Sequence, residues 1–175
     1  MTRRSDDFAE FYEANYGRTV ALVAAMVGSR HEAEDVAQEA FARALTQWPL
    51  LRRYDLPEAW VRKVALRIAV DSGRRMRRNF ATAARIAVLR QPTEPEPSDS
   101  LTFSALGAAL RELPIREREA IVLYYVADLS IEAIARESGL PVGTVKTRLA
   151  AGRRHLERYL SDELSGVAVT EGAAR

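Results

Sequence analysis

The chain has 175 residues, 47% of them hydrophobic and 29% charged, which is typical of a soluble globular protein with one domain or two small ones. It contains no cysteine, which excludes disulfides, cysteine-ligated zinc and cysteine nucleophiles, and it has no apolar run of about eighteen residues that could span a membrane. The net charge is only +2 and the N-terminus turns acidic before any apolar stretch, so we expect no signal peptide and a cytoplasmic protein.

A linker is predicted near the middle of the chain. Residues 91–100, QPTEPEPSDS, combine three prolines and three acids with no basic residue. Proline lacks a backbone donor and disfavours helix in the residue before it, so this segment should be extended. The predicted organisation is a first module over residues 1–90, a linker over 91–102, a second module over 103–162 and a short tail over 163–175. No segment shows the alternation typical of strands, so the predicted fold is all-α, two small helical domains joined by a flexible linker.

An aromatic series opens the first module. Phe8, Phe11, Tyr12 and Tyr16 recur at spacings of three and four, which predicts an amphipathic helix. A second, apolar helix is predicted over about residues 19–27 and should end at Gly28.

The next helix is marked by a capping pattern. Ser29 is followed three residues later by Glu32, which predicts a helix that runs to about residue 47. We expect the Trp48-Pro49 pair to break it. The helical repeat assigns to the core face Ala33, Val36, Ala37, Ala40, Phe41, Ala44 and Leu45, and to the solvent face Asp35, Gln38, Glu39 and Arg43.

The last helix of the first module is basic. Asp55-Leu56-Pro57-Glu58 predicts its start, with a cap and a proline at the first position. Its inward side chains should be Trp60, Val61, Val64, Ala65 and Ile68. Residues 57–90 hold nine Lys or Arg against two acids, and one stripe is formed by Lys63, Arg67, Arg74 and Arg78. The stripe favours nucleic-acid binding, with a solvated surface as the alternative. Trp60 could stack on an unpaired base, but a place in the core is the favoured interpretation.

Four helices are predicted in the second module, over residues 103–113, 115–126, 131–138 and about 142–160. Pro114 should open the second helix and Ser130 should cap the third. Gly139 should stop the third, because glycine adopts the left-handed conformation most easily. We expect these helices to pack on a core of Leu, Ile and Val.

Residues 130–149, SIEAIARESGLPVGTVKTRL, have the features of a helix-turn-helix. A small residue, Ala135, lies where the two helices should cross, and Gly139 lies in the turn. The apolar anchors on both sides of the turn are Ile134, Leu140, Val145 and Leu149. Along the last helix, one face holds Val142, Val145, Leu149, Gly152, Leu156 and Leu160.

The opposite face of the last helix is basic, since residues 141–160 carry five Lys or Arg against one acid. If its N-terminal part enters a major groove, base edges and phosphates should meet Thr144, Lys146, Thr147 and Arg148. Farther along, Arg153 and Arg154 suit backbone phosphate, which gives affinity but not sequence choice. The alternative is a helical hairpin with a solvated basic face; DNA binding is favoured because cap, glycine, anchors and charge agree.

No catalytic or metal-binding constellation is visible in the sequence. Neither His31 nor His155 has a ligand set nearby, and the Glu-x-x-His partners of a di-metal bundle are missing around Glu32, Glu34, Asp35 and Glu39. There is no Gly-rich phosphate loop and no nucleophile elbow. We therefore expect no cofactor, no metal and no enzymatic activity.

Three segments together resemble the sigma factors of bacterial RNA polymerase. Residues 33–41, AEDVAQEAF, resemble the helix by which sigma factors grip the β′ clamp helices. Residues 57–78, with Trp60 and with Asp71 followed by arginines, resemble the promoter-melting helix, and residues 113–160 resemble the module that reads the −35 element. The order of these segments and the missing middle domain are similar to the extracytoplasmic-function (group IV) members of the sigma-70 family, especially compact actinobacterial ones, over residues 6–78 and 103–160.

The resemblance implies roles for particular residues. Core polymerase would be contacted by Asp35, Gln38 and Glu39. A flipped base of the −10 element would enter a pocket in the loop over residues 51–56, which includes Arg52, Arg53, Tyr54 and Asp55. DNA there would be held by Arg62, Lys63, Arg67, Arg74 and Arg75. Many relatives have Asn where this chain has Arg67, so a phosphate contact suits Arg67 better than a base contact. The −35 element would face Lys146, Thr147, Arg148 and Ala151.

The resemblance also implies partners. These are core RNA polymerase, through its β′ clamp helices and its β flap, promoter DNA, and an anti-sigma protein, with no insertion into a membrane. The implied function is promoter recognition, DNA melting and initiation of transcription. A stand-alone DNA-binding regulator is the second hypothesis, although no apolar heptad for dimerisation is evident. A nucleic-acid enzyme is the third, and it lacks candidate catalytic residues.

Overall fold

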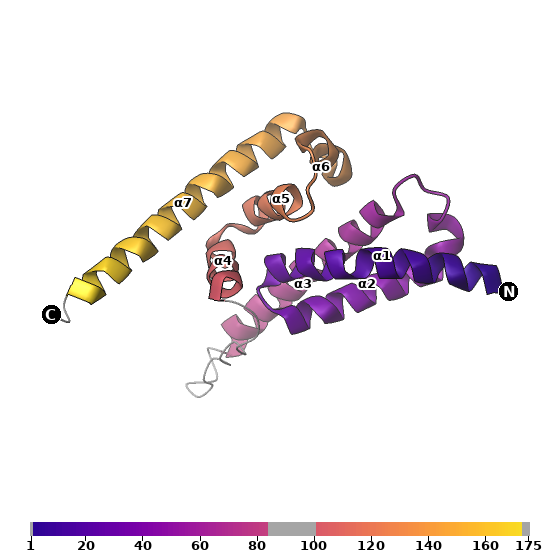
Figure 1. Ribbon diagram of the computed structural model, residues 1–175, viewed down its shortest axis with the longest axis horizontal. Helices are drawn as coiled ribbons and strands as arrows, with labels where there is room; N and C mark the ends of the chain where they lie inside the picture. The colour runs from indigo at the N-terminus through magenta and orange to yellow at the C-terminus, as the bar shows by residue number, and fades with distance from the viewer. Residues whose placement is uncertain (1, 84–100, 173–175) are drawn as a thin grey trace. The chain divides into compact units, whose positions relative to one another are not determined.

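The computed structural model describes residues 2–83 and 101–172, and every regular element in these two ranges is a helix (Figure 1). The chain separates into two compact units, residues 1–99 and 100–175. The first contains α1 (Thr2–Val27), α2 (Arg30–Leu51) and α3 (Pro57–Ala83), and the second contains α4 (Leu101–Glu112), α5 (Ile115–Tyr125), α6 (Ile131–Ser138) and α7 (Val142–Gly172). The predicted all-α fold is confirmed for these ranges. Residues 91–100 of the predicted linker lie outside them.

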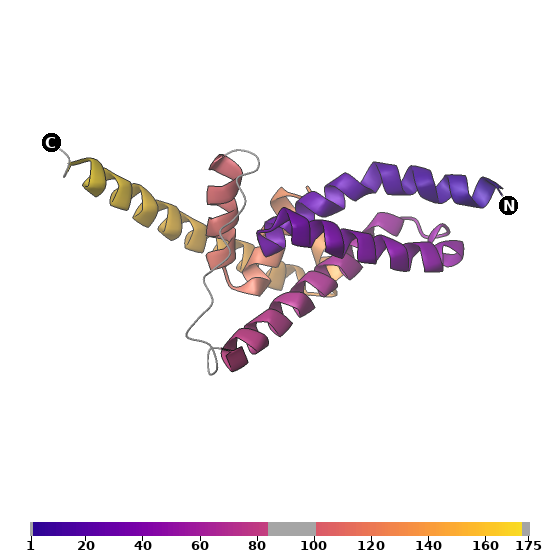
Figure 2. The ribbon, with the colours of Figure 1, turned by 90° about the horizontal axis from the view of Figure 1, so that it is seen from below.

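The first unit is built around aromatic side chains that α1 and α2 share. These two helices lie side by side and α3 packs against both (Figures 1 and 2). The ring centroids of Phe11 and Trp48 are 4.8 Å apart, and those of Tyr12 and Phe41 are 5.0 Å apart. Such ring pairs add to the stabilisation that burial of their apolar area provides. The aromatic series of the sequence is therefore the α1 side of the core.

The prediction of two helices before Gly28 was wrong, because α1 is continuous from Thr2 to Val27. Gly17 is the helix-weakening residue between them, and a glycine inside a helix costs only about 1 kcal/mol relative to alanine. Thr19 is also accommodated, since its hydroxyl donates a hydrogen bond of 2.9 Å to the carbonyl of Asn15. Packing of the whole apolar face on α2 and α3 outweighs this weak signal.

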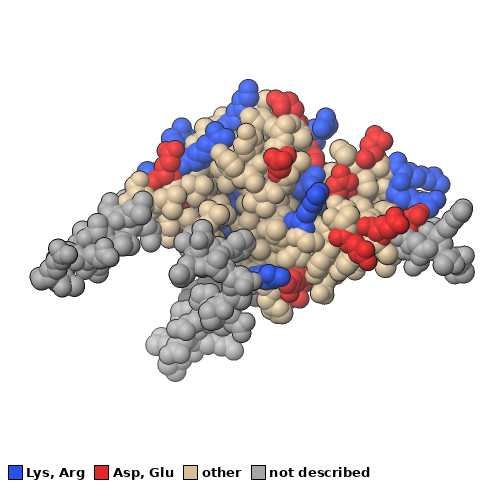
Figure 3. Space-filling model, viewed as in Figure 1, with Lys and Arg blue, Asp and Glu red and all other residues tan. Residues whose placement is uncertain are grey.

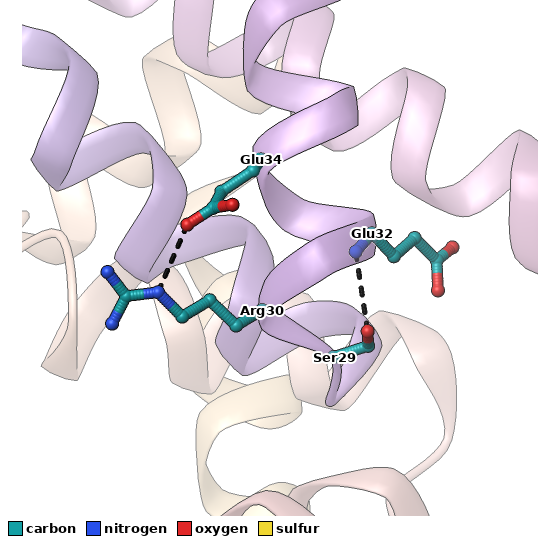
Figure 4. Close-up of polar contacts among 4 residues, drawn as sticks. All are labelled: Ser29, Arg30, Glu32 and Glu34. Carbon is teal, nitrogen blue, oxygen red and sulfur yellow. Dashed lines mark hydrogen bonds and ion pairs between the residues drawn. The ribbon is translucent and has the colours of Figure 1, made fainter. Parts of the chain in front are cut away.

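The start of α2 is confirmed and its end is not. Ser29 is the N-cap, and its hydroxyl accepts a hydrogen bond of 3.3 Å from the backbone N–H of Glu32 (Figure 4). At the other end, α2 continues through Pro49 to Leu51. Trp48 lies one turn beyond Ala44 on the core face and is only 5% exposed, so burial of its indole holds the last turn together. Leu45, expected in the core, is 56% exposed because it lies at the edge of the buried face, on the flank of the helix beyond Phe41.

The second unit packs α4, α5 and α6 against α7. Its buried side chains include Ile121 and Leu123 of α5, Ile134 of α6, and Val145 and Leu149 of α7. Helix α7 was predicted to end near residue 160 but extends to Gly172. The ends of its predicted apolar face, Val142 and Leu160, are exposed, so only the middle of that face lies in the core.

Candidate nucleic-acid and polymerase interfaces

The predicted helix-turn-helix is formed by α6 and α7. Ser130 caps α6, its hydroxyl accepting a hydrogen bond of 3.1 Å from the N–H of Ala133. Gly139 ends α6 in the left-handed conformation, with φ of 67°. Ile134 and Val145 are both buried, which fixes one face of each helix. The remaining face of α7 is therefore turned to solvent by the packing of α6 and α5.

The exposed face of α7 is the basic one. Figure 3 shows Lys and Arg side chains along this helix. The exposed members of the predicted DNA-binding set are Lys146, Thr147, Arg153 and Arg154, and the half-buried members are Thr144, Arg148 and Ala151. The Thr147 hydroxyl donates a hydrogen bond of 2.9 Å to the carbonyl of Gly143. The arrangement can therefore present ammonium and guanidinium groups to a polyanion from one side of a single helix.

Two of the predicted DNA-binding arginines also interact with α5. Arg148 lies beside Glu119, whose pKa is raised by burial, an effect that Arg148 and Arg116 oppose with their positive charge. The Arg153 guanidinium lies over the rings of Tyr124 and Tyr125, 5.5 and 5.6 Å from their centroids. Sequence reasoning missed these contacts because helical spacing relates residues of one helix only.

Two further contacts of α5 were also missed. Buried Arg118 donates from Nη2 to the carbonyls of Arg111 and Leu113, the latter at 3.1 Å. These carbonyls end α4, where a positive charge is also favoured by the helix dipole. His155 of α7 pairs through Nδ1 with the carboxylate of Glu117. Both interactions tie α5 to its neighbours and so support the position of α7.

In the first unit, the predicted polymerase-binding residues lie on the exposed face of α2. Asp35, Gln38 and Glu39 are all exposed, whereas Ala37 and Ala40 are buried. Glu39 forms an ion pair of 2.8 Å with Arg43. Glu34 forms one of 3.0 Å with Arg30, which Figure 4 shows. Such exposed pairs contribute little to stability, so the carboxylates remain available to a partner. The pKa of Glu32 is raised by burial and by the nearby charge of Asp35.

The loop between α2 and α3 holds the first predicted −10 group. All four of its residues are exposed: Arg52, Arg53, Tyr54 and Asp55. Arg52 also forms an ion pair with α1, because its Nη1 lies 3.3 Å from the carboxylate of Asp7. The structure thus joins the loop to the start of α1, a contact between residues far apart in sequence.

Helix α3 holds the second predicted −10 group. Lys63 and Arg67 are exposed one turn apart, and Arg62 is half-buried. The side chains of Arg74 and Arg75 lie outside the described residues. Trp60 is partly buried against the core of the unit, which agrees with the favoured interpretation of this residue. A basic surface and an exposed loop therefore occur in the same helical unit.

Within the parts of the chain that the structure describes, no helix is both long enough and apolar enough to cross a membrane. The same ranges contain no group of three His, Asp or Glu side chains arranged to hold a metal ion.

Comparison with known proteins identifies both units. The family model for Sigma-70 region 2 matches residues 11–79, and the model for Sigma-70, region 4 matches residues 103–156. The chain is 30% identical over 172 residues to the ECF RNA polymerase sigma factor SigW of Bacillus subtilis, with 90% of each chain covered. It is 32% identical over 166 residues to the ECF RNA polymerase sigma factor SigE of Mycolicibacterium smegmatis, covering 91% of this chain and 63% of that relative.

Solved structures show the same fold. The sigma factor RpoE of Bartonella quintana, in complex with the anti-sigma factor NepR, has a TM-score of 0.70 at 23% identity and covers 89% of this chain and 97% of its own. CnrH, in complex with the cytosolic domain of CnrY, has a TM-score of 0.66 at 23% identity, with 90% of each chain covered. The two family models together span more than half of the chain, in the order in which the sequence placed the modules. The chain therefore belongs to the extracytoplasmic-function sigma factors of the sigma-70 family.

Proposed function

We propose that this sigma factor divides promoter recognition between its two units. Residues 1–90 would bind core RNA polymerase and the −10 element, and residues 103–162 would bind the −35 element. The observation that carries the proposal is the exposed basic face of α7 in a helix-turn-helix whose other face is fixed by Val145 and Leu149. The protein would act in the cytoplasm, with the polymerase and the chromosome.

The contacts of α7 would differ along its length. A helix fits the major groove and reads base edges with its N-terminal residues. Lys146 and Thr147 lie in the second turn of α7, so we assign them to this group, with Thr144, Arg148 and Ala151 beside them. Arg153 and Arg154 lie about two turns farther on and would contact phosphate, which adds affinity that falls with salt.

The first unit would supply docking and melting. Asp35, Gln38 and Glu39 form a polar, acidic face that suits a basic surface of the polymerase, and we assign the β′ clamp helices to it. Opening a duplex costs about 1.4 kcal/mol of stacking per base-pair step, so separated bases must be captured. The exposed loop between α2 and α3, which includes Tyr54, would take a flipped base. The other residues of the loop pocket would be Arg52, Arg53 and Asp55. The strand would be held by Arg62, Lys63, Arg67, Arg74 and Arg75.

The proposed work requires no bond chemistry in this chain. Base capture and duplex binding depend on stacking, hydrogen bonds and charge, so we propose that the protein is not an enzyme. Because the polymerase tethers both units to one promoter, neither unit needs high affinity alone.

We also propose that an anti-sigma protein binds this chain. The sigma factor RpoE of Bartonella quintana, which has a similar fold, was solved in complex with the anti-sigma factor NepR. A protein that covered the basic face of α7 or the exposed face of α2 would prevent the two contacts proposed above.

Transcription with purified components tests the proposed function. The full chain would be mixed with core RNA polymerase and genomic DNA fragments of its own organism, and the 5′ ends of the transcripts would be mapped. Discrete start sites that depend on the protein are expected. Failure of the chain to bind core polymerase would overturn the proposal. Footprinting without polymerase separates it from a stand-alone regulator, which should protect DNA by itself.

A further inference from the structure

Two consecutive tyrosines at the end of α5 contact one arginine of α7. The Arg153 guanidinium lies 5.5 Å from the ring centroid of Tyr124 and 5.6 Å from that of Tyr125. The two rings are themselves packed edge to face, with centroids 4.9 Å apart. The two distances from the guanidinium to the rings are within the range of about 6 Å at which an aromatic ring attracts a cation. One arginine is thus held by two rings from a neighbouring helix.

Arg153 keeps hydrogen-bond donors for a ligand. Its guanidinium carries five N–H donors in one plane, and the contacts with the two rings use its positive charge. Arg153 is exposed on the flank of the basic face of α7. A long side chain normally loses rotamer freedom when it binds a ligand, and that loss reduces affinity. Here the two rings restrict Arg153 before any DNA arrives.

We propose that Tyr124 and Tyr125 are positioning residues that hold the Arg153 guanidinium in the orientation in which it binds a DNA phosphate. The inference rests on the proposed −35 contact of α7 and adds two residues of α5 that neither sequence reasoning nor the helix-turn-helix itself identified. The tyrosines act through Arg153 and need no contact with DNA.

Tyr125 is the better position for a test. It is 58% exposed and borders an open cavity of about 360 Å³ with Asp128, Leu129 and Ser130, so its ring is not needed to fill the core. Tyr125→Leu removes the ring but keeps an apolar side chain. Tyr125→Phe keeps the ring and removes only the hydroxyl, so it is the matched control.

The measurement is the affinity of the holoenzyme, full chain plus core polymerase, for the most active genomic promoter fragment from the transcription experiment. It is made at several salt concentrations, for both Tyr125 variants, for Arg153→Ala and for the double variant Tyr125→Leu with Arg153→Ala. Tyr125→Leu should weaken binding about two- to fivefold, the equivalent of one exposed cation–π contact. Its salt dependence should equal that of the unmodified protein, because Arg153 keeps its charge. Arg153→Ala should reduce the slope of log K against log salt by about 0.9.

The decisive comparison is the double variant. If Tyr125 acts through Arg153, then Tyr125→Leu causes no further loss in the Arg153→Ala background, and Tyr125→Phe binds normally. Equal losses with and without Arg153 would overturn the inference, as would a defect in Tyr125→Phe or unchanged binding by Tyr125→Leu. If the unmodified holoenzyme forms no promoter complex, the proposed function itself fails. If the complex forms but its affinity is unchanged by Tyr125→Leu, only the proposed positioning role of the tyrosines fails.

Discussion

Gly152 allows a stability prediction with an internal comparison. A Cβ at this position of α7 would lie 2.7 Å from Cγ1 of Ile121 and 3.2 Å from Cδ2 of Leu113. Cγ1 is close to the backbone of α5, so Ile121 cannot move away by rotating a flexible end. Gly152→Ala would gain up to about 1 kcal/mol from helix propensity and lose about 1–3 kcal/mol from overpacking. We expect a net loss of about 0–2 kcal/mol in the free energy of unfolding of the second unit.

Gly107→Ala is the matched control for this prediction. Gly107 is also inside a helix of the second unit, α4, but nothing lies within 4 Å of its Cβ position. Both substitutions gain the same helix propensity, so the difference between their free energies of unfolding measures the steric contact at residue 152 alone. That difference should be about 1–3 kcal/mol, with Gly107→Ala the more stable.

Hydrogen exchange of the full chain in urea, followed by mass spectrometry, measures this difference in the peptides of α5 and α7. Both tryptophans, Trp48 and Trp60, belong to the first unit, so tryptophan fluorescence should give the same unfolding curve for every variant. If Gly152→Ala is as stable as Gly107→Ala, the close approach of α7 to α5 does not limit the size of this residue, and the reasoning is refuted.

Four more predictions concern charged and polar side chains. Arg118→Met should lower the unfolding free energy of the second unit by about 1.5–3 kcal/mol, measured by the same exchange experiment, because two carbonyls at the end of α4 lose a charged donor. Gln38→Ala with Glu39→Ala should weaken binding to core polymerase in a titration and leave the circular dichroism spectrum unchanged. Lys146→Ala should change the −35 sequence selected from a randomised promoter library. Burial raises the pKa of Glu119 in the folded protein, so this carboxyl favours folding most below its ordinary pKa, and the free energy of unfolding should fall as the pH rises from about 4 toward 7. Glu119→Gln should make that fall smaller, because glutamine does not titrate.

Each of these predictions has an outcome that contradicts it. Unchanged exchange in the Arg118→Met variant would show that its hydrogen bonds to α4 are not needed. Equal polymerase affinity of the Gln38 and Glu39 double variant would remove the proposed docking face. An unchanged selected sequence would remove Lys146 from base recognition. A pH dependence of unfolding that is the same with Glu119→Gln would show that burial of this carboxyl carries no cost.

Local signals in the sequence were sufficient for much of the fold. Ser29 and Ser130 predicted helix starts, and Gly139 predicted the turn of the helix-turn-helix, because capping bonds and left-handed φ angles depend on neighbours in the chain. The helical repeat identified the core face of α7 at Val145 and Leu149, and hence the opposite exposed face, for the same reason.

The errors occurred where a weak local signal competed with packing. Gly17 and Pro49 both disfavour helix, yet α1 and α2 continue past them because these helices bury aromatic side chains on each other. The helical repeat also assigned Leu45 to the core, but this residue lies at the edge of the buried face of α2 and is exposed.

By itself, the sequence determined the all-helical fold, the starts of α2 and α6, the polar face of α7, and the order of the two units. Only the tertiary structure decided the partners: Arg153 on the tyrosines of α5, Arg118 at the end of α4, and Arg52 beside Asp7. The physical reason is that a side chain's direction on its own helix follows from spacing, whereas the group it meets belongs to another helix. The packing of the apolar faces determines which group a side chain meets, and this cannot be derived from residue spacing within one helix.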